Sequence, residues 1–416
     1  MTQKIKYWKN VITQAIGNGS AQFVGILGLP ILARFYSPEA FANQAIFIQI
    51  VTLMTAFITF RLEYFIPLLK TSNESRIFSG FIIKFGFFIS LIATFLIYLL
   101  SLFEFQNFKI DFYYYFAPLT AFSISFALVL QHEAQRNECF KISAYSEVAS
   151  KFSYIIFGIL GSFLSSSIGL ILTTFFGAIG KTLFLLKYLK RIKYKSSGIE
   201  VALKFKNVAL GMIFANTLLT FTALILFFFI EKFYGMNYLG QFSLVISTVF
   251  LPSGLIGSAV GAVFYQRGAV LVNEVKIDDL KILWKDNLVK LISLSFPIYF
   301  IIFIFGDVLY AFVFGEKWSK AGEISEVLAV AAFFSFISGP LDRIGILLNV
   351  RYYLFFIHTV RFLLTISGIY FCFKYEINEY YFLWIYVFFL CLIYTLDIIF
   401  GRYFIFLKGK YECKVF

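Results

Sequence analysis

The chain has 416 residues, of which 60% are hydrophobic and only 14% are charged, and its mean hydropathy is +0.83. A soluble domain of this length needs many more charged residues to cover its surface, so the composition excludes that class. The formal net charge of +13 is attributed to membrane topology and to attraction for anionic lipid, and no nucleic-acid partner is expected.

Twelve apolar segments of about 20 residues are long enough to cross a bilayer as α-helices. Transmembrane β-strands would be about ten residues long and would alternate in polarity, which these segments do not do. The sequence therefore predicts an all-α integral membrane protein with spans at 11–33, 41–66, 79–103, 113–131, 145–164, 168–186, 208–230, 239–264, 287–305, 324–347, 353–373 and 382–406.

Lys and Arg residues are distributed unevenly over the segments that connect these spans. Most of them fall on the side of the membrane that holds the N-terminus, and cytoplasmic loops carry such an excess. The sequence therefore predicts that both termini are cytoplasmic. The basic residues before the first span resemble a signal peptide, but the apolar run is too long, so we interpret it as a retained helix.

The first span carries an amide stripe. Gln14, Asn18 and Gln22 recur every four residues, so they share one face of a helix. Amides in a membrane helix need partners in the protein or in a wet cavity. These three residues are therefore candidates for lining a cavity.

The second span contains two charges, Arg61 and Glu63, within an apolar and aromatic stretch. At about 100° per residue, Glu63 shares a polar face with four other residues: Gln49, Thr52, Thr55 and Thr59. We take Thr52 and Thr59 as cavity candidates and Glu63 as a candidate for ion coupling, with structural pairing as the alternative. Arg61 lies opposite and is expected to reach the cytoplasmic headgroups or to pair elsewhere.

The fifth and sixth spans carry charges near their cytoplasmic ends. Glu147 and Lys151 are four residues apart and are expected to pair with each other. Lys181 continues the helix face of Thr174 and Gly177. We therefore predict that Lys181 is a cavity residue that can contact an anionic substrate.

A polar, basic segment at 187–207 divides the chain near its middle. We interpret this segment as a solvated cytoplasmic linker. The predicted organisation is then an N-terminal six-helix lobe, the linker, a C-terminal six-helix lobe and a cytoplasmic tail, at 1–186, 187–207, 208–406 and 407–416.

A short internal repeat supports the division into halves. RFYSPEAFANQ at 34–44 and KFYGMNYLGQF at 232–242 each open with a cation followed by Phe-Tyr, and each precedes an even-numbered span on the outer side. The position of the two copies predicts two halves of the same orientation, related by an axis along the membrane normal. The external segment 315–322 is expected to anchor Trp318 at the level of the lipid headgroups.

The second half carries the most deeply placed charge. Arg361 lies eight residues into its span, roughly 12 Å along a helix, on a face with His358 and Thr365. A charge at that depth usually faces the interior of a helix bundle, so Arg361 and His358 are candidates for binding substrate. Asp342 and Asp397 are candidates for ion coupling, with ordinary helix-end charges as the alternative.

Four segments together resemble the polysaccharide biosynthesis transporter family, which comprises O-antigen-type flippases of the multidrug/oligosaccharidyl-lipid/polysaccharide superfamily. The similarity follows the order of the chain, and its most specific block is FGEKWSKAG. Where the family often has Arg-Tyr-Glu, this chain has Arg-Leu-Glu. The matching segments are LARFYSPEAFANQAIF (32–47), FRLEYFIPLLKTSNES (60–75), LPSGLIGSAVGAVFYQRGAVLVNE (251–274) and FGEKWSKAGEISEVLAVAAFFSFISGPLDR (314–343).

The resemblance implies two six-helix lobes around a central cavity in the bacterial inner membrane. It also implies a non-enzymatic flippase that moves an undecaprenyl-pyrophosphate-linked oligosaccharide to the periplasmic leaflet by rocking of the two halves. The implied partners are this substrate, the membrane lipids, and the polysaccharide polymerase and chain-length machinery. No cofactor or metal is expected, and the sequence leaves open whether a proton or a sodium gradient drives transport.

Two other function classes are weighed against the flippase. A drug/cation antiporter of the same superfamily would have an acidic cation site without the family segments quoted above. A membrane polysaccharide polymerase or ligase would carry a large periplasmic loop, and none of the outer loops expected here is longer than about twenty residues. The flippase is therefore the leading prediction.

Overall fold

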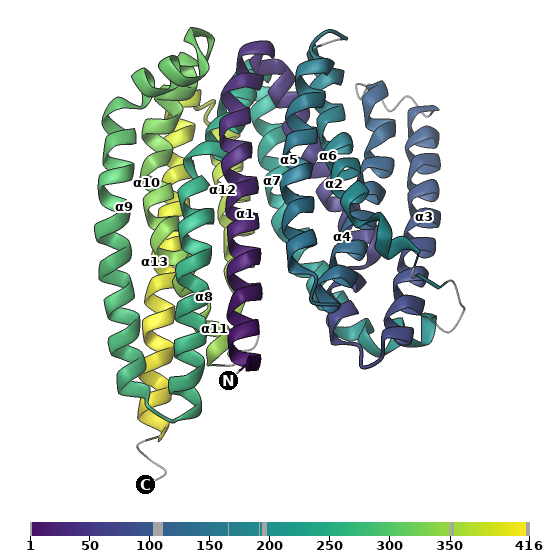
Figure 1. The fold of residues 1–416 in the computed structure, drawn as a ribbon. Coiled ribbons are helices and arrows are strands. Elements are labelled where there is room, and N and C mark those ends of the chain that lie inside the picture. The colour runs from purple at the N-terminus through teal and green to yellow at the C-terminus, as the bar shows by residue number, and fades with distance from the viewer. Residues whose placement is uncertain are drawn as a thin grey trace. The chain divides into compact units, whose positions relative to one another are not determined.

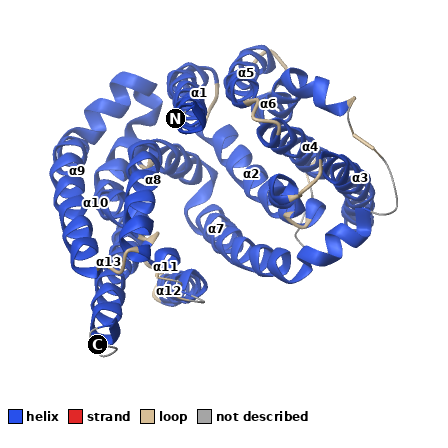
Figure 2. Ribbon diagram, turned by 60° about the horizontal axis from the view of Figure 1, so that its bottom comes forward, coloured by secondary structure: helices blue, strands red, loops and turns tan. Residues whose placement is uncertain are grey.

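The computed structural model is built of helices (Figures 1 and 2). Within the residues that it describes, every regular element is an α-helix or a short 3-10 helix. The prediction of an all-α fold is therefore confirmed. The described residues are 2–102, 111–164, 166–190, 192–193, 198–348, 350 and 353–412.

The chain forms two compact units, Met1–Leu224 and Ile225–Phe416, which we call unit 1 and unit 2. Unit 1 contains α1 (Thr2–Phe35), α2 (Pro38–Thr59), the 3-10 helix η1 (Leu62–Leu68), α3 (Ser72–Leu102), η2 (Phe112–Phe116), α4 (Ala117–Arg136), α5 (Phe140–Gly161), α6 (Ser166–Leu189) and the first part of α7 (Gly198–Val249). Unit 2 contains the rest of α7, α8 (Leu251–Asn273), α9 (Ile277–Phe314), η3 (Glu316–Trp318), α10 (Ser319–Leu341), α11 (Ile344–Leu347), α12 (Tyr353–Lys374) and α13 (Glu379–Glu412).

Within unit 1, α5 packs against α1 and α6, and α4 packs against α2, α3 and α6. Glycines permit the closest approach, since a Cβ added to Gly169 on α6 would lie 2.2 Å from the carbonyl oxygen of Gly161 on α5. Such small-residue contacts let the backbones of membrane helices meet. They bring the polar side chains of α4, α5 and α6 within reach of one another.

The predicted second span is wrong at its C-terminal end. α2 ends at Thr59 because Phe60 and Arg61 both adopt left-handed backbone conformations, with φ of 51° and 56°. The chain continues as η1, whose Leu62, Phe65 and Ile66 are buried in a core cluster with residues of α3. Glu63 therefore does not continue the helical face of Thr52 and Thr59.

The predicted boundaries of the eighth span, 239–264, also need correction. α7 continues to Val249 and contains one non-helical residue, Gly235, with φ 87°. A new helix, α8, begins at Leu251, and Pro252 lies in its first turn. Proline is tolerated there because the first N–H groups of a helix have no helical partner. The predicted span thus runs across the end of α7 and the start of α8.

The Phe-Tyr repeat makes the same kind of contact in each unit. In unit 1 the Tyr36 hydroxyl donates to the carbonyl oxygen of Gly158 at 2.6 Å, in the last turn of α5. In unit 2 the Tyr234 hydroxyl donates to the carbonyl oxygen of Ile377 at 2.8 Å, just after α12. Tyr36, in the turn after α1, and Tyr234, on α7, therefore each bond to the end of one helix of a hairpin, α5–α6 or α12–α13.

Nine segments among the described residues are long and apolar enough to cross a membrane. One of them covers α7 and α8 together, so it corresponds to more than one predicted span. Large apolar side chains are exposed along these helices, for example Phe95 and Phe388 at 59% and 62%. This exposure is expected where a bilayer, and not water, surrounds the protein.

Candidate functional site

A charged cluster connects α4, α5 and α6 in unit 1. The Lys181 Nζ atom on α6 donates to Oε1 of Glu147 on α5 at 2.7 Å, and Nε2 of Gln131 on α4 donates to the same oxygen at 2.8 Å. The Lys181 side chain is 12% exposed and that of Glu147 is 28% exposed. We call these three residues the Lys181 cluster.

Glu147 and Lys151 interact electrostatically, but no direct salt bridge joins them among the described residues, so the expected close pair is not formed. Lys151 is exposed, and its Nζ atom lies 6.0 Å from the ring centroid of Tyr154. The physical reason is the close approach of α6 to α5, where a Cβ added to Gly177 would lie 3.3 Å from the carbonyl oxygen of Ser150. Because α6 lies so close to α5, the Lys181 side chain reaches the Glu147 carboxylate directly, whereas Lys151, one turn along α5, does not.

The ammonium group of Lys181 has donor capacity beyond its ion pair. An ammonium group has three N–H donors. Among the described residues Lys181 makes one hydrogen bond, to Glu147. Two of its N–H donors are therefore not used by that contact.

Glu63 is the most deeply buried of the candidate acids. Its exposed fraction is 0%, and neither carboxylate oxygen has a hydrogen-bond partner within the described part of the chain. Arg61 is also buried, at 9%, and lies with its Cζ atom 5.9 Å from the ring centroid of Tyr64. Of the two expected positions for Arg61, extension to the headgroups is wrong, and the side chain instead packs within the protein beside Tyr64.

The other candidates of unit 1 are not brought together with Lys181 by any hydrogen bond within the described residues. Thr52 is exposed and donates to its own helix, at the Ile48 carbonyl oxygen. Thr59 is buried and donates to the Thr55 carbonyl oxygen. Gln22 is half-buried on α1, and the side chains of Gln14 and Asn18 lie outside the described residues.

Arg361 lies on α12 of unit 2 and is held by α13. Its Nη2 atom donates to the Tyr394 hydroxyl at 2.7 Å, and its Cζ atom lies 5.3 Å from the centroid of the same ring. His358 is half-buried one turn away, and its Nδ1 atom has no hydrogen-bond partner among the residues that the structure describes. Thr365 on the same helix is buried.

Asp397 lies on α13, three residues after Tyr394, and is 8% exposed. Ser338 on α10 donates to its Oδ2 atom at 2.5 Å, and the Tyr353 hydroxyl on α12 donates to its Oδ1 atom. Asp342, in the turn after α10, is half-buried and interacts electrostatically with Asp397. We call Arg361, Tyr394, Asp397, Ser338 and Tyr353 the Arg361 cluster.

Sequence reasoning missed several members of these clusters. Tyr394 shares a helix face with Asp397 through its three-residue spacing, a signal that was available. Gln131 and Tyr353 gave no comparable signal. Glu133 on α4 was also missed, although it is only 4% exposed and accepts hydrogen bonds from Ser75 and Ser79 of α3.

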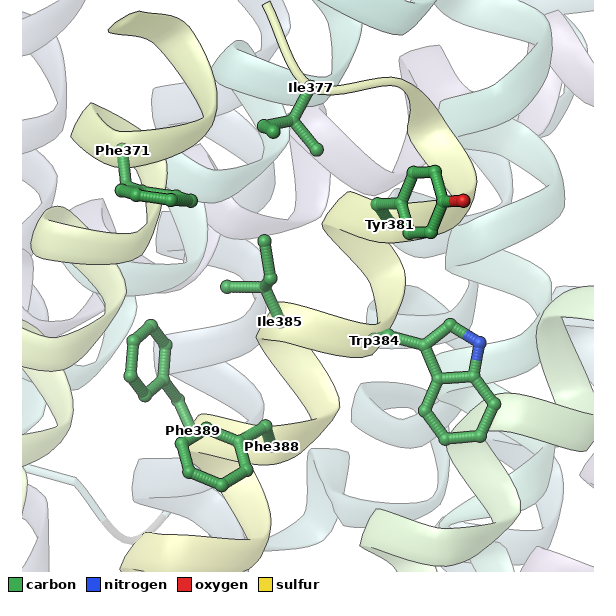
Figure 3. Close-up of a pocket in the computed structure, with 7 residues that line it drawn as sticks. All are labelled: Phe371, Ile377, Tyr381, Trp384, Ile385, Phe388 and Phe389. Atoms are coloured by element: carbon green, nitrogen blue, oxygen red, sulfur yellow. The ribbon is translucent and has the colours of Figure 1, made fainter. Parts of the chain in front are cut away.

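A groove of about 580 Å³ between α12 and α13 contains none of the candidate residues (Figure 3). Its lining is apolar and aromatic and comprises Phe371, Ile377, Tyr381, Trp384, Ile385, Phe388 and Phe389. Such a surface offers no charged partner to an anion.

Comparison with known proteins agrees with the helical architecture. The family model described as polysaccharide biosynthesis protein matches residues 31–323. No curated protein sequence is significantly similar to this chain.

Solved structures of MOP superfamily transporters share its fold. The lipid II flippase MurJ in an inward closed conformation has a TM-score of 0.68 and 16% identity, covering 95% of this chain and 87% of its own. An inward-facing multidrug resistance MATE transporter has a TM-score of 0.65 and 13% identity, with coverage of 95% and 99%. A MOP superfamily transporter from Pyrococcus furiosus has a TM-score of 0.65 and 14% identity, with coverage of 96% of each chain.

Proposed function

The chain belongs to the polysaccharide biosynthesis protein family, and we propose that it is a flippase for lipid-linked oligosaccharides. The proposed substrate is an undecaprenyl-pyrophosphate-linked repeat unit of O-antigen or a related surface polysaccharide. The protein would move it from the cytoplasmic to the periplasmic leaflet of the bacterial inner membrane by alternating access, with both termini in the cytoplasm. Similarity to the structure of a lipid II flippase supports this proposal at the level of the fold.

The observation that carries the proposal is the environment of Arg361. This cation lies within an apolar span, and its hydrogen-bond partner is the neutral Tyr394 hydroxyl. Within the described residues no carboxylate lies within salt-bridge distance of it. The guanidinium group is half-buried, and Asp397 interacts with it electrostatically without forming a salt bridge. A cation at this depth that is not engaged in a direct ion pair is suited to an anionic ligand.

The proposed role of Arg361 is to hold the pyrophosphate of the substrate. A guanidinium group can bind two phosphate oxygens at once through its planar pair of N–H donors. Tyr394 orients that group by a hydrogen bond and by contact with the ring face. Within unit 1, Lys181 is proposed as a phosphate contact in its own right, and Gln14, Asn18, Gln22, Thr52 and Thr59 as headgroup contacts. Within unit 2, His358 is proposed as a further headgroup contact.

Ion coupling is proposed for Glu63, Asp342 and Asp397. A buried carboxyl group without a donor, such as Glu63, is stabilised when it takes up a proton or a cation. Movement of that ion along its gradient could supply the free energy for transport. The polysaccharide polymerase and the chain-length machinery are proposed as functional partners that use the transported repeat unit.

The role of Arg361 can be tested in a bacterial strain from which the gene for this protein has been deleted. Each variant is expressed in that strain, and export of the surface glycan is measured. Arg361→Ala should lower export about tenfold or more, as expected from the loss of a hydrogen bond to a charged group worth about 1.5–3 kcal/mol. Arg361→Lys should retain part of the activity, and Tyr394→Phe should weaken export less than Arg361→Ala. Arg402→Ala, which changes an exposed arginine of α13, is the matched control.

Membrane abundance must be measured for each variant by immunoblotting. Full export by a normally abundant Arg361→Ala protein would contradict the proposed substrate contact. Loss of abundance in both Arg361 variants would instead assign Arg361 a structural role, in which its hydrogen bond to Tyr394 joins α12 to α13.

A further inference from the structure

The beginning of α7 has two different faces. Val201, Phe205 and Ala209 face unit 1, where Val201 and Ala209 belong to a buried cluster with residues of η1 and α3. The Phe205 ring stacks on Phe65 of η1 with centroids 4.5 Å apart. The spacing of these residues follows the helical period, so they fix one side of the helix against the protein.

The opposite face carries an exposed stripe. Ile199, Leu203 and Leu210 have exposed fractions of 52%, 57% and 55%, and Lys206 is exposed between them. Their spacing of four, three and four residues places them on one side of the helix. No element among the described residues covers this stripe. An apolar stripe with an embedded lysine is typical of a helix that lies at a membrane surface.

Contacts with the polar first turn of α3 show how deep in the membrane the start of α7 lies. The Lys204 Nζ atom lies 3.8 Å from Oε1 of Glu74, and Lys193 donates from its Nζ atom to Oδ1 of Asn73 at 2.8 Å. A Cβ added to Gly198 would lie 2.4 Å from Cβ of Phe81. The segment therefore lies where the apolar part of α3 begins, which is the boundary between hydrocarbon and headgroups.

The length of α7 also places its first turns at the boundary between hydrocarbon and headgroups. From Gly198 to the break at Gly235 the helix is about 55 Å long at 1.5 Å per residue. The hydrocarbon core of a bilayer is about 30 Å thick. The first turns of α7 therefore exceed what a span needs and can lie in the headgroup region.

We propose that residues 198–210 form an interfacial helix that binds anionic phospholipid through the stripe of Ile199, Leu203, Lys206 and Leu210. Anionic phospholipid is the proposed partner because the segment is strongly basic. The surrounding segment 187–207 contains seven Lys and Arg residues and one acid, Glu200. A basic amphipathic helix of this kind attracts anionic headgroups, while its apolar residues enter the upper acyl region.

Bromolipid quenching of a tryptophan reporter tests this inference without any transport assay. Leu203→Trp places the reporter on the stripe of the full-length protein, and the protein with its four native tryptophans supplies the background signal. The variant is reconstituted into vesicles of equal parts phosphatidylglycerol and phosphatidylcholine, with bromine on one lipid or on the other. Brominated phosphatidylglycerol should quench the reporter about threefold more strongly, as expected for lysines at an anionic surface.

Charge variants make the test specific. Lys206→Gln removes the cation of the stripe, leaves the contact of Lys204 with Glu74 in place, and should lower the quenching ratio. The matched control, Lys285→Gln on α9, removes one charge from an exposed position elsewhere and should leave the ratio unchanged. Equal quenching by both lipids in the starting protein would overturn the inference. Absence of quenching by either lipid would also overturn it, because the stripe would then face water or a protein partner.

Discussion

At the scale of single residues, the pair of Lys181 and Glu147 shows what helical spacing alone does not predict. The four-residue spacing favoured Lys151 as the partner of Glu147, whereas the structure assigns Lys181 at 2.7 Å. An ion pair within one helix is stabilised by only a few tenths of a kcal/mol. Close packing of α6 on α5 through glycines is therefore sufficient to change the partner.

This difference gives a direct prediction about stability. Glu147→Gln should lower the free energy of unfolding by about 1–3 kcal/mol, because it removes the acceptor of a partly buried charge. Lys151→Gln should change it by less than about 0.5 kcal/mol, since Lys151 is exposed. Thermal unfolding of the purified proteins in the same detergent measures both. Equal destabilisation by the two variants would indicate that Glu147 pairs with Lys151 after all.

Glu63 allows a prediction about ion coupling. Glu63→Gln keeps the size of the side chain but removes its ability to carry a proton or to ligate a cation with a charge. Transport by this variant should lose its dependence on an imposed proton or sodium gradient. Glu200→Gln, an exposed acid on α7, should keep that dependence. A gradient dependence that persists in Glu63→Gln would remove this residue from the coupling mechanism.

At the scale of elements, the end of α2 could not be read from the residues that surround it. Neither glycine nor proline lies between Thr59 and Glu63, so the apolar pattern predicts a continuous helix. The break depends on two left-handed residues that are stabilised by burial of η1 against α3. Such a tertiary contact overrides local propensity, and no short-range signal reports it.

The external turn before α10 provides a second example. Trp318 was expected at the headgroup level, but it is fully buried. The Gln241 side chain holds this turn, since it donates to the Lys317 carbonyl oxygen at 2.8 Å and accepts from the Ala321 N–H at 3.0 Å. An amide many residues away in sequence thus determines where the tryptophan lies. The expectation that Trp318 anchors in lipid is therefore wrong.

Close packing of α9 and α10 gives a prediction at the same scale. A Cβ added to Gly322 would lie 2.3 Å from the Cα atom of Asp307, so Gly322→Ala requires the two backbones to separate. This change should lower the free energy of unfolding by about 1–3 kcal/mol. Gly254→Ala on α8 is the control, because no atom lies within 4 Å of its added Cβ, and it should be neutral or slightly stabilising. Thermal unfolding that is unchanged by Gly322→Ala would contradict the packing described for this hairpin.

At the scale of the whole molecule, composition and segment length were sufficient to predict the class of the fold. Apolar segments of membrane length can form only helices or closed barrels in lipid, so their length identifies the all-α class. The partners of individual side chains depend on which helices are neighbours, and a single sequence does not contain that information. The sequence therefore treated Glu147 and Lys181 as separate residues and did not single out Gln131, although the three form one cluster. The division of the chain into lobes and a linker at 187–207 remains a prediction.

The proposed function makes a physical claim about the whole protein: it shelters a charged headgroup during passage across hydrocarbon. Arg361 and Lys181 supply positive charge within membrane-spanning helices, and acidic residues supply sites for a coupling ion. A drug/cation antiporter of the same fold would instead use its acidic residues to bind a cationic substrate. The two functions therefore differ in the charge of the molecule that crosses the membrane.

Translocation in vesicles of defined composition tests the flippase claim most directly. The purified protein is reconstituted with an undecaprenyl-pyrophosphate-linked oligosaccharide that carries a fluorophore on its sugar, and a membrane-impermeant quencher reports the fraction in each leaflet. The account predicts that the labelled lipid exchanges between leaflets only in vesicles that contain the protein, and that Arg361→Ala slows this exchange about tenfold or more. Lack of exchange, together with uptake of a cationic drug by the same vesicles, would contradict it.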